Sequence, residues 1–245
     1  MNIRFIGIGS AFNTKLGNTS AYQKKKQSLF LIDCGSLVFH QLKEQEIIQD
    51  LKKIYVVITH THPDHVASLA ELIFYSYYIL KIKIEVIFPD EKQIRRLLNL
   101  VGATAEMYYL HAERTLQIKD EALGVIEVTS VEAHHTESMP AFSLYIKNEE
   151  GRIFYSGDCT DLREGVVTEL EQGMLERAYQ DTCSSDYEGN LHCYIGKLEK
   201  QVPPHLRHKV YCMHLDEKLT PEKIREKGFE VVTRHVYKAN EASAY

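Results

Sequence analysis

The stretch THTHPDHVASL, which begins at Thr59, constrains this chain more than any other part of its sequence. Directly behind the apolar run IYVVIT it places four side chains of the kind that ligate metals, His60, His62, Asp64 and His65. Pro63 prevents the residues before it from continuing smoothly as a helix, and side chains at i and i+2 of an extended segment point the same way. The first two histidines can therefore face one point, while the aspartate and the third histidine, which open the next helix, face a second point nearby.

Two imidazoles on one side and a carboxylate with an imidazole on the other suit two adjacent divalent metal ions. The alternatives are a chance cluster on the surface, or histidines that cap a helix. Four potential ligands at a junction between a strand and a helix favour the metal site. We therefore expect two divalent metal ions, with zinc as the expected metal because the ligands are rich in imidazole.

The rest of the chain alternates strand-like and helix-like segments without a linker, a repeat or a low-complexity segment. Apolar runs at Ile3–Ile8, Ser28–Ile32, Ile54–Ile58 and 84–88 predict buried strands. Between Val66 and Tyr77, apolar residues recur with the spacing of one helix face, which predicts a helix of three to four turns. The expected class is α/β, with one domain over residues 1–245.

Capping and turn residues set the boundaries of further elements. Asp90, with Gln93 in the capping-box position, predicts a helix that ends at Gly102. The pair Thr220-Pro221 predicts a short helix, which Gly228 closes before the strand FEVV. The segment FSLYIKNEEGRIFYSGD predicts a β-hairpin joined by residues 148–151.

Composition argues against several classes of protein. The formal net charge is −5 and Lys24–Lys26 is the longest basic run, whereas a protein that holds a long nucleic acid through many phosphate contacts is expected to be more basic. We expect no membrane partner, because no run of eighteen apolar residues occurs, and no signal peptide, because MNIRFIGIGSA enters a strand pattern at once. Five cysteines without a CxxC pair indicate reduced thiols and a cytoplasmic location.

The segment THTHPDH matches the HxHxDH signature of the metallo-β-lactamase superfamily. The remaining ligands of that superfamily come, in order, from an isolated His, an Asp and a final His, and AHHTES, YSGDCT and CMHLD supply them here, each after a strand-like run. The resemblance covers most of the chain and implies a four-layer αβ/βα sandwich with two metals at one edge of the sheets. It implies one metal held by His60, His62 and His135, another held by Asp64, His65 and His214, and Asp158 as the bridge. His134 is the alternative to His135, which is preferred because the ligand of the closest subfamily precedes Ser or Thr, as His135 precedes Thr136.

The segments FIGIGSAFNTKLGNTSAY and LIDCGSLVFHQL resemble the ribonuclease Z branch of this superfamily. That branch also carries an acidic residue ahead of a distant histidine, and YQDTCSSDYEGNLHCY supplies Asp181 and His192. The match is partial, because Asp181 replaces a Glu and His192-Cys193-Tyr194 replaces His-Ser-Thr. The resemblance implies that His192, oriented by Asp181, protonates a leaving 3′ oxygen; the alternative is a histidine of the core or of a helix N-terminus. The predicted catalytic residues are His192, Asp181 and Asp64.

The distance between the third histidine ligand and the bridging aspartate bears on the substrate. Many ribonuclease Z enzymes insert a long tRNA-gripping arm there, whereas this chain has only the 22 residues 136–157. A compact member of the branch resembles hydrolases of small phosphodiesters and is similar to the phage anti-Pycsar proteins, which degrade cyclic nucleotide signals. The resemblance implies a homodimeric phosphodiesterase of the host cytoplasm that opens 3′,5′-cyclic mononucleotides to nucleoside monophosphates and so disarms an antiviral defence signal. Its partner is a small cyclic nucleotide and no long nucleic acid. The alternatives are a tRNA 3′ endonuclease, a lactonase or thioesterase on the same metals, and a binding protein with a degenerate site.

Overall fold

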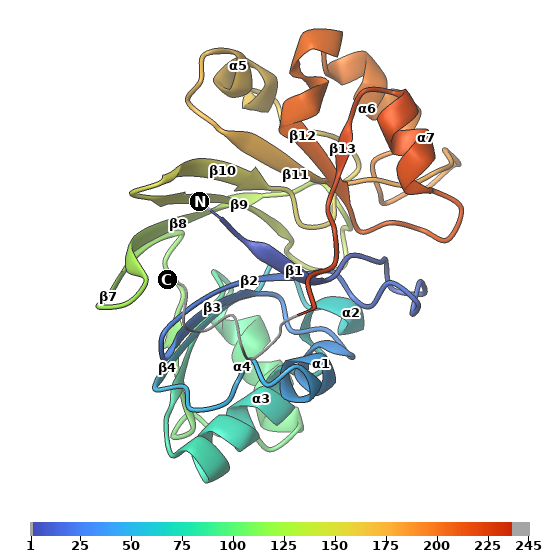
Figure 1. Cartoon of the computed structure of the whole chain (residues 1–245). Helices are drawn as coiled ribbons and strands as arrows, with labels where there is room; N and C mark the ends of the chain where they lie inside the picture. Colours follow the sequence, from blue (N-terminus) through green and yellow to red (C-terminus); the bar gives the residue numbers. More distant parts are fainter. Residues whose placement is uncertain (1, 237–245) are drawn as a thin grey trace.

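The computed structural model describes residues 2–236, which form four layers in the order helices, sheet, sheet and helices (Figure 1). The first sheet has six strands in chain order: β1 (Arg4–Gly7), β2 (Ser20–Lys25), β3 (Ser28–Ile32), β4 (Lys53–Val57), β5 (Ile84–Ile87) and β6 (Tyr108–His111). Neighbours from β1 to β3 pair antiparallel, and neighbours from β3 to β6 pair parallel. The helices on its outer face are α1 (Val38–Glu44), α2 (Pro63–Val66), α3 (Leu69–Tyr75) with the π-helical turn η1 (Ser76–Leu80), and α4 (Glu91–Leu100).

The second sheet has seven strands in the order β13 (Glu230–Val231), β12 (Val210–Met213), β11 (Arg177–Asp181), β10 (Gly151–Tyr155), β9 (Phe142–Asn148), β8 (Gly124–Glu132) and β7 (Thr115–Asp120). Strands β10 to β13 pair parallel, whereas β7 to β10 pair antiparallel. Its outer face carries α5 (Val166–Glu171), α6 (Ile195–Gln201), the 3₁₀ helix η2 (Pro204–Lys209) and α7 (Pro221–Glu226) (Figure 1).

Strand β3 shows how one segment contributes to two core layers. All five residues of SLFLI are buried. Because side chains alternate along a strand, Leu29 and Leu31 pack in the cluster beneath the helices, while Phe30 and Ile32 pack between the two sheets. A strand buried on both faces reads as a continuous apolar run, and each such side chain contributes about 1.5–3 kcal/mol by leaving water.

The predicted fold class, an α/β four-layer sandwich, is confirmed, and several predicted boundaries are found. Strands β1, β3, β4 and β5 lie on the four predicted apolar runs, and β9 and β10 form the predicted hairpin with Asn148 opposite Gly151. Asp90 Oδ1 accepts the backbone N–H of Gln93 at 2.8 Å, and Thr220 is the N-cap of α7. That residues 1–245 form one domain stays a prediction. Within the described part of the chain, no helix is both long and apolar enough to cross a membrane.

The single helix predicted between Val66 and Tyr77 is wrong. Helix α2 ends at Val66, α3 begins at Leu69, and the last predicted turn is part of the π-helical segment η1. The break has a physical cause at Ser68, whose backbone N–H donates to Cys34 O at 3.1 Å and whose hydroxyl donates to Gly35 O at 2.6 Å. A contact with a turn more than thirty residues away therefore interrupts a periodicity that is continuous in the sequence.

Candidate metal centre

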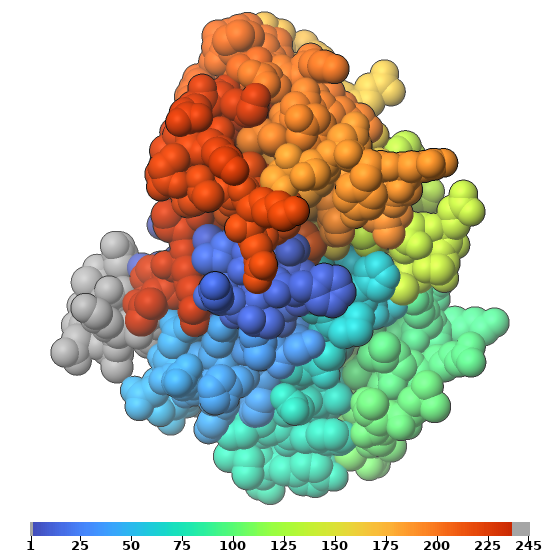
Figure 2. Space-filling view, turned by 90° about the vertical axis from the view of Figure 1, so that its right-hand side faces the viewer, coloured from blue at the N-terminus to red at the C-terminus, as the bar shows by residue number. Residues whose placement is uncertain are grey.

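The predicted site residues occupy loops that leave the carboxyl ends of strands in both sheets. His60 follows β4 after two residues, His135 follows β8, Asp158 follows β10 and His214 follows β12 directly. Because β10, β11 and β12 are parallel neighbours, the loops that carry Asp158 and His214 leave the same edge of the second sheet, beside Asp181 at the end of β11. Figure 2 looks at the molecule from the right-hand side of Figure 1, where the blue N-terminal loop lies between the orange segments of the second half and the blue and cyan segments of the first.

One group of side chains, the three-histidine cluster, consists of His60, His62, His135 and Asp158. His62 Nδ1 lies 3.0 Å from His60 Nε2 and 3.1 Å from His135 Nε2. Asp158 Oδ2 lies 3.7 Å from the first of these Nε2 atoms and 3.8 Å from the second. The neighbouring His134 is exposed, whereas His135 is buried, so the structure places only the preferred histidine of this pair in the cluster.

A second group, the Asp64 cluster, consists of Asp64, His65, His214 and again Asp158. His65 Nε2 lies 3.3 Å from Asp64 Oδ2 and 3.2 Å from Asp158 Oδ1. His214 Nε2 lies 3.2 Å and 3.4 Å from the same two oxygens. Asp158 thus turns one oxygen toward each cluster, which is the arrangement expected of a bridging carboxylate.

These spacings leave room for an ion among the side chains of each cluster. Ligand atoms about 2.0–2.2 Å from a tetrahedral ion lie about 3.3–3.6 Å from one another, close to the distances in both clusters. His65 Nε2 and Asp158 Oδ1 are buried, and neither forms a hydrogen bond although they lie only 3.2 Å apart. Both atoms therefore point toward a common position between them instead of toward each other.

The charge of the centre leads to the same conclusion. Four buried carboxylates gather there, Asp33, Asp64, Asp158 and Asp181, and a buried charge is stable only when it is compensated. Burial alone would raise the pKa of Asp158, but the imidazoles of His214 and His65 outweigh it and hold this pKa well below its usual range. Burial would likewise lower the pKa of His214, yet Asp158 and other carboxylates raise it to about 10. Two divalent cations would balance the four negative charges, so the residues present fit the implied metals.

His192 lies beside both clusters but is engaged differently. Its Nδ1 forms a 2.8 Å hydrogen bond with Asp181 Oδ2, and the same nitrogen lies 3.9 Å from Asp158 Oδ2. Burial lowers the pKa of His192, but its ion pair and hydrogen bond with Asp181 outweigh that effect and raise it. Asp181 itself is fully buried, while the His192 side chain is 27% exposed. The pair can therefore hold a proton at the open side of the metal centre.

Sequence reasoning assigned no role to Asp33, which forms hydrogen bonds with His65 and Thr59 on the side of His65 that faces away from the Asp64 cluster. Asp33 Oδ2 accepts His65 Nδ1 at 2.8 Å and the hydroxyl of Thr59 at 2.8 Å, and Oδ1 accepts the backbone N–H of Thr59. It follows β3 directly, and β3 is the parallel neighbour of β4, which leads into the histidine motif. A charged residue directly after a fully buried strand was the signal that could have indicated that Asp33 supports a predicted ligand.

Two close backbone contacts hold the loops in place. A Cβ atom built on Gly35 would lie 1.8 Å from Asp64 O, so only glycine fits where the turn after β3 meets the ligand loop. On the other side, Ser10 N donates to Leu215 O and Leu215 N donates to Ile8 O, which fixes the residue after His214. The opening Gly-x-Gly-Ser segment thus forms a turn that supports the loop of a predicted ligand.

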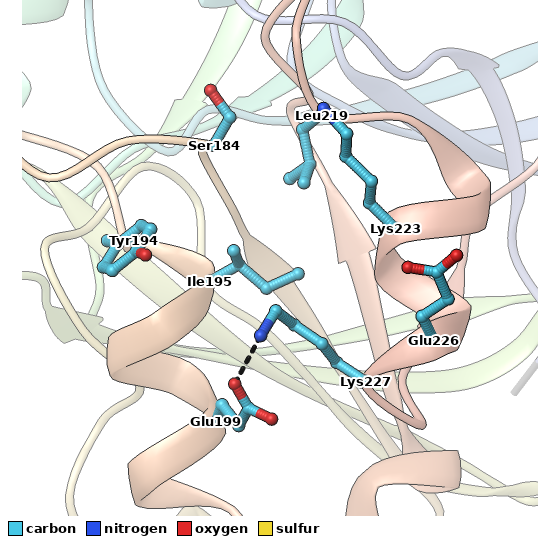
Figure 3. A pocket seen from close by; sticks show the side chains of 8 residues that line it. All are labelled: Ser184, Tyr194, Ile195, Glu199, Leu219, Lys223, Glu226 and Lys227. Carbon is cyan, nitrogen blue, oxygen red and sulfur yellow. Dashed lines mark hydrogen bonds and ion pairs between the residues drawn. The ribbon is translucent and has the colours of Figure 1, made fainter.

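A pocket of about 440 Å³ lies apart from this centre, between α6 and α7 (Figure 3). Its charges are balanced, with Lys227 Nζ 2.5 Å from Glu199 Oε2, and it contains none of the predicted site residues. It is lined by Ser184, Tyr194, Ile195, Glu199, Leu219, Lys223, Glu226 and Lys227. The metal centre, and not this pocket, carries the chemistry.

The sequence and the fold are similar to those of known proteins. Residues 1–237 match the family model described as "Anti-Pycsar protein Apyc1". The Apyc1 protein of Paenibacillus harenae is 25% identical over 224 residues, covering 87% of this chain and 89% of the relative, and that of Bacillus phage BSP38 is 24% identical over 236 residues, covering 89% and 90%.

Solved structures share the fold. The metallo-β-lactamase fold protein YhfI of Bacillus subtilis superposes with a TM-score of 0.69 at 14% identity, covering 94% of each chain. The short form of human tRNase Z superposes with a TM-score of 0.62 at 19% identity, covering 97% of this chain and 98% of that chain. The expected metallo-β-lactamase fold is confirmed, and the paired histidine and aspartate clusters at its edge support a metal-dependent hydrolase. With its family model matched over nearly the whole sequence, the chain belongs to the anti-Pycsar Apyc1 family.

Proposed function

We propose that this chain is a two-metal phosphodiesterase that opens 3′,5′-cyclic mononucleotides to nucleoside monophosphates. The observation that carries the proposal is the pairing of His192 with Asp181 at 2.8 Å, next to the shared carboxylate Asp158. Expelling a sugar alkoxide requires a proton donor in a fixed position, whereas a thioesterase expels a thiolate that leaves without one. The pair therefore favours a phosphodiesterase over a thioesterase on the same metals.

The residues that would hold the metals divide into two sets that share Asp158. One set is the three-histidine cluster, and the other is the Asp64 cluster. Zinc is the proposed metal, because five imidazole nitrogens contribute to the two sets. Two divalent ions in these positions would lower the pKa of a water molecule and neutralise phosphate oxygens.

The remaining chemistry is carried out by side chains of the chain. Asp181 Oδ2 accepts a hydrogen bond from the Nδ1–H group of His192, which leaves Nε2 to donate a proton to the departing 3′ oxygen. The raised pKa of His192 favours its charged form, which is the form able to donate. Asp181 therefore positions the donor, and His192 transfers the proton.

The alternative of tRNA 3′ processing is less well supported. Between His135 and Asp158 the chain forms only a short loop and the hairpin of β9 and β10, whose strands are joined at Asn148–Gly151. Such a hairpin offers no arm to grip a tRNA, and the net charge of −5 is unfavourable for many phosphate contacts. The matched family and the relative from Bacillus phage BSP38 both carry the name anti-Pycsar protein. This name supports a small cyclic nucleotide as the substrate and a role against a defence signal.

A homodimer in the host cytoplasm is part of the proposal. The aromatic-rich segment behind the metal motif leaves Tyr78 52% exposed and Ile79 64% exposed on the outer helical layer. Exposed apolar side chains of this size that lie together commonly mark contact surfaces. We propose that this segment of η1 forms the interface between two copies of the chain.

The test is a substrate panel with the metal-loaded protein. Cyclic nucleotides, a lactone, a thioester and a tRNA precursor are incubated separately, and the products are resolved by chromatography. The proposal expects conversion of at least one 3′,5′-cyclic nucleotide to a mononucleotide and no cleavage of the precursor. Cleavage of the tRNA precursor without turnover of any cyclic nucleotide would replace the proposal with the tRNA endonuclease.

A further inference from the structure

The two clusters of the metal centre differ in the groups that contact the outward-facing nitrogens of their histidines. In the Asp64 cluster, each histidine turns its Nδ1 toward a buried carboxylate that is not itself a predicted ligand. His65 Nδ1 forms a 2.8 Å hydrogen bond with Asp33 Oδ2, whereas His214 Nδ1 lies 3.3 Å from Asp181 Oδ1 without forming a hydrogen bond. Both carboxylates are fully buried, so water screens neither of them.

The three-histidine cluster is supported by neutral oxygens. His60 Nδ1 lies 3.1 Å from the hydroxyl of Thr59, and His135 Nδ1 donates to the carbonyl of Leu191 at 3.0 Å. His62 turns Nδ1 into the cluster and is partly exposed, and its Nε2 forms no hydrogen bond with any residue that the structure describes. No carboxylate contacts the far side of these three rings among the residues that the structure describes.

The ligand charges differ in the same direction. Each cluster shares Asp158, but only the Asp64 cluster has a second carboxylate among its ligands. A carboxylate that accepts the far N–H of a ligating imidazole, as Asp33 does for His65, makes that imidazole more basic and fixes its orientation, and Asp181 adds a buried negative charge beside His214. The Asp64 cluster therefore presents more negative charge to a cation than the three-histidine cluster does, together with one ring, that of His65, held by a carboxylate.

We propose that the Asp64 cluster binds its metal first and more tightly, and that Asp33 and Asp181 are positioning residues that set this order. The inference rests on the proposed two-metal centre and adds an order of loading to it. Asp181 then serves two groups through its two oxygens, His214 through Oδ1 and the proton donor His192 through Oδ2. The weaker, partly exposed three-histidine cluster holds the metal that exchanges.

The order of loading is measured by metal binding and not by catalysis. The full-length protein is freed of metal by dialysis against a chelator and titrated with Zn²⁺ in competition with a chromophoric chelator. Two dissociation constants that differ by at least about tenfold are expected, which is the low end of the effect of such outer partners on metal affinity. His62→Ala should abolish the weaker event and keep the tight one, whereas Asp64→Ala should abolish the tight one.

Asparagine variants test the two positioning residues. Asp33→Asn and Asp181→Asn each keep the size of the side chain and remove its charge, and each should weaken the tight site by about 10–100-fold. The loss should be larger for Asp33→Asn, because its contact with the imidazole is 2.8 Å and not 3.3 Å. The matched control is Asp216→Asn in the loop after His214, because Asp216 accepts the backbone N–H groups of Ser184, Lys218 and Leu219, belongs to neither cluster, and should leave both constants unchanged when replaced.

Folding of each variant is checked by circular dichroism. If Asp33→Asn does not fold, the variants Asp181→Asn, His62→Ala and Asp64→Ala still test the order of metal loading. Loss of the tight event in His62→Ala would overturn the inference, as would two sites of equal affinity or unchanged affinity in both asparagine variants. These results would leave the two-metal phosphodiesterase standing. Failure of the wild-type protein to bind two ions would instead remove the proposed function itself.

Discussion

Replacing His192 by alanine separates a proton donor from a structural histidine. If His192 protonates the leaving 3′ oxygen, its loss should matter only when the leaving group needs a proton. A cyclic nucleotide releases a sugar alkoxide, whose conjugate acid is very weak. Bis-p-nitrophenyl phosphate releases a stabilised phenolate that needs little protonation. We therefore expect His192→Ala to lose activity toward the first substrate and to keep most of it toward the second.

The size of the loss follows from the geometry. His192 Nδ1 lies 2.8 Å from Asp181 Oδ2 and 3.9 Å from Asp158 Oδ2, and His192 belongs to neither of the two clusters, so removal of the ring should take away a donor and none of the predicted ligands. A positioned acid contributes about 10²–10⁴-fold, which corresponds to about 3–5 kcal/mol in the barrier. Truncation removes one hydrogen-bond partner of the buried Asp181, which keeps the backbone N–H of Cys159, so a loss of stability is expected and is measured in parallel.

The assay compares kcat/KM for both substrates at saturating metal, with the metal content of each variant measured in parallel. Asp181→Asn should show the same dependence on the leaving group more weakly, because it disturbs the orientation of His192 and leaves the donor in place. Equal losses on the two substrates, or loss of metal in His192→Ala, would refute the assignment of His192 as the acid and leave it a packing or ligand role.

Three further predictions concern the metals, the substrate and the assembly. Asp158→Ala removes the only carboxylate shared by both clusters, so elemental analysis should find that it loses both metals; a normal metal content would contradict the two-metal centre. The wild-type protein should open 3′,5′-cyclic nucleotides and leave pre-tRNA uncut, as chromatography of both reactions would show. Ile79→Asp places a charge on the exposed segment of η1 and should convert the proposed homodimer to a monomer, as measured by light scattering. The control is Met174→Asp, at an exposed position near α5, which should leave the oligomeric state unchanged.

That the predicted ligands lie together was predictable because their chemistry is rare and their position in the chain is regular, whereas their binding of metal stays a prediction. Each predicted ligand group follows an apolar strand, and the parallel strands β10, β11 and β12 bring their carboxyl ends to one edge. The choice between His134 and His135 depended on a resemblance, since adjacent residues cannot be distinguished by spacing. The structure buries one and exposes the other, and the binding of metal by His135 stays a proposal.

The contacts that sequence reasoning missed are those between segments far apart in the chain. Ser68 interrupts the predicted helix because its hydroxyl donates to Gly35 O, and Asp33 reaches His65 because β3 and β4 are parallel neighbours. Gln93 likewise occupies a capping-box position, yet its side chain donates to Thr61 between two ligand histidines at 2.6 Å. Local patterns assign these residues to turns and caps, and only the pairing of the strands shows that they support the metal centre.

Each cluster combines predicted ligands from loops of both sheets. We therefore expect metal binding to raise the stability of the folded protein. The loop after β4 supplies His60 and Asp64, whereas loops of the second sheet supply His135, Asp158 and His214. Without cations the four buried carboxylates at this edge repel one another, and a cation that binds only the folded protein stabilises it by mass action, by about 2.7 kcal/mol at a free concentration 100 times the dissociation constant.

We therefore expect removal of the metals with a chelator to lower the Tm measured by calorimetry, and added Zn²⁺ to restore it. Asp158→Ala should abolish most of this dependence, because it removes the bridge between the clusters. The control is Asp216→Asn, which should keep the full metal-dependent shift because Asp216 belongs to neither cluster. An unchanged Tm of the wild-type protein after complete removal of metal would show that the ions do not hold the two sheets together at this edge.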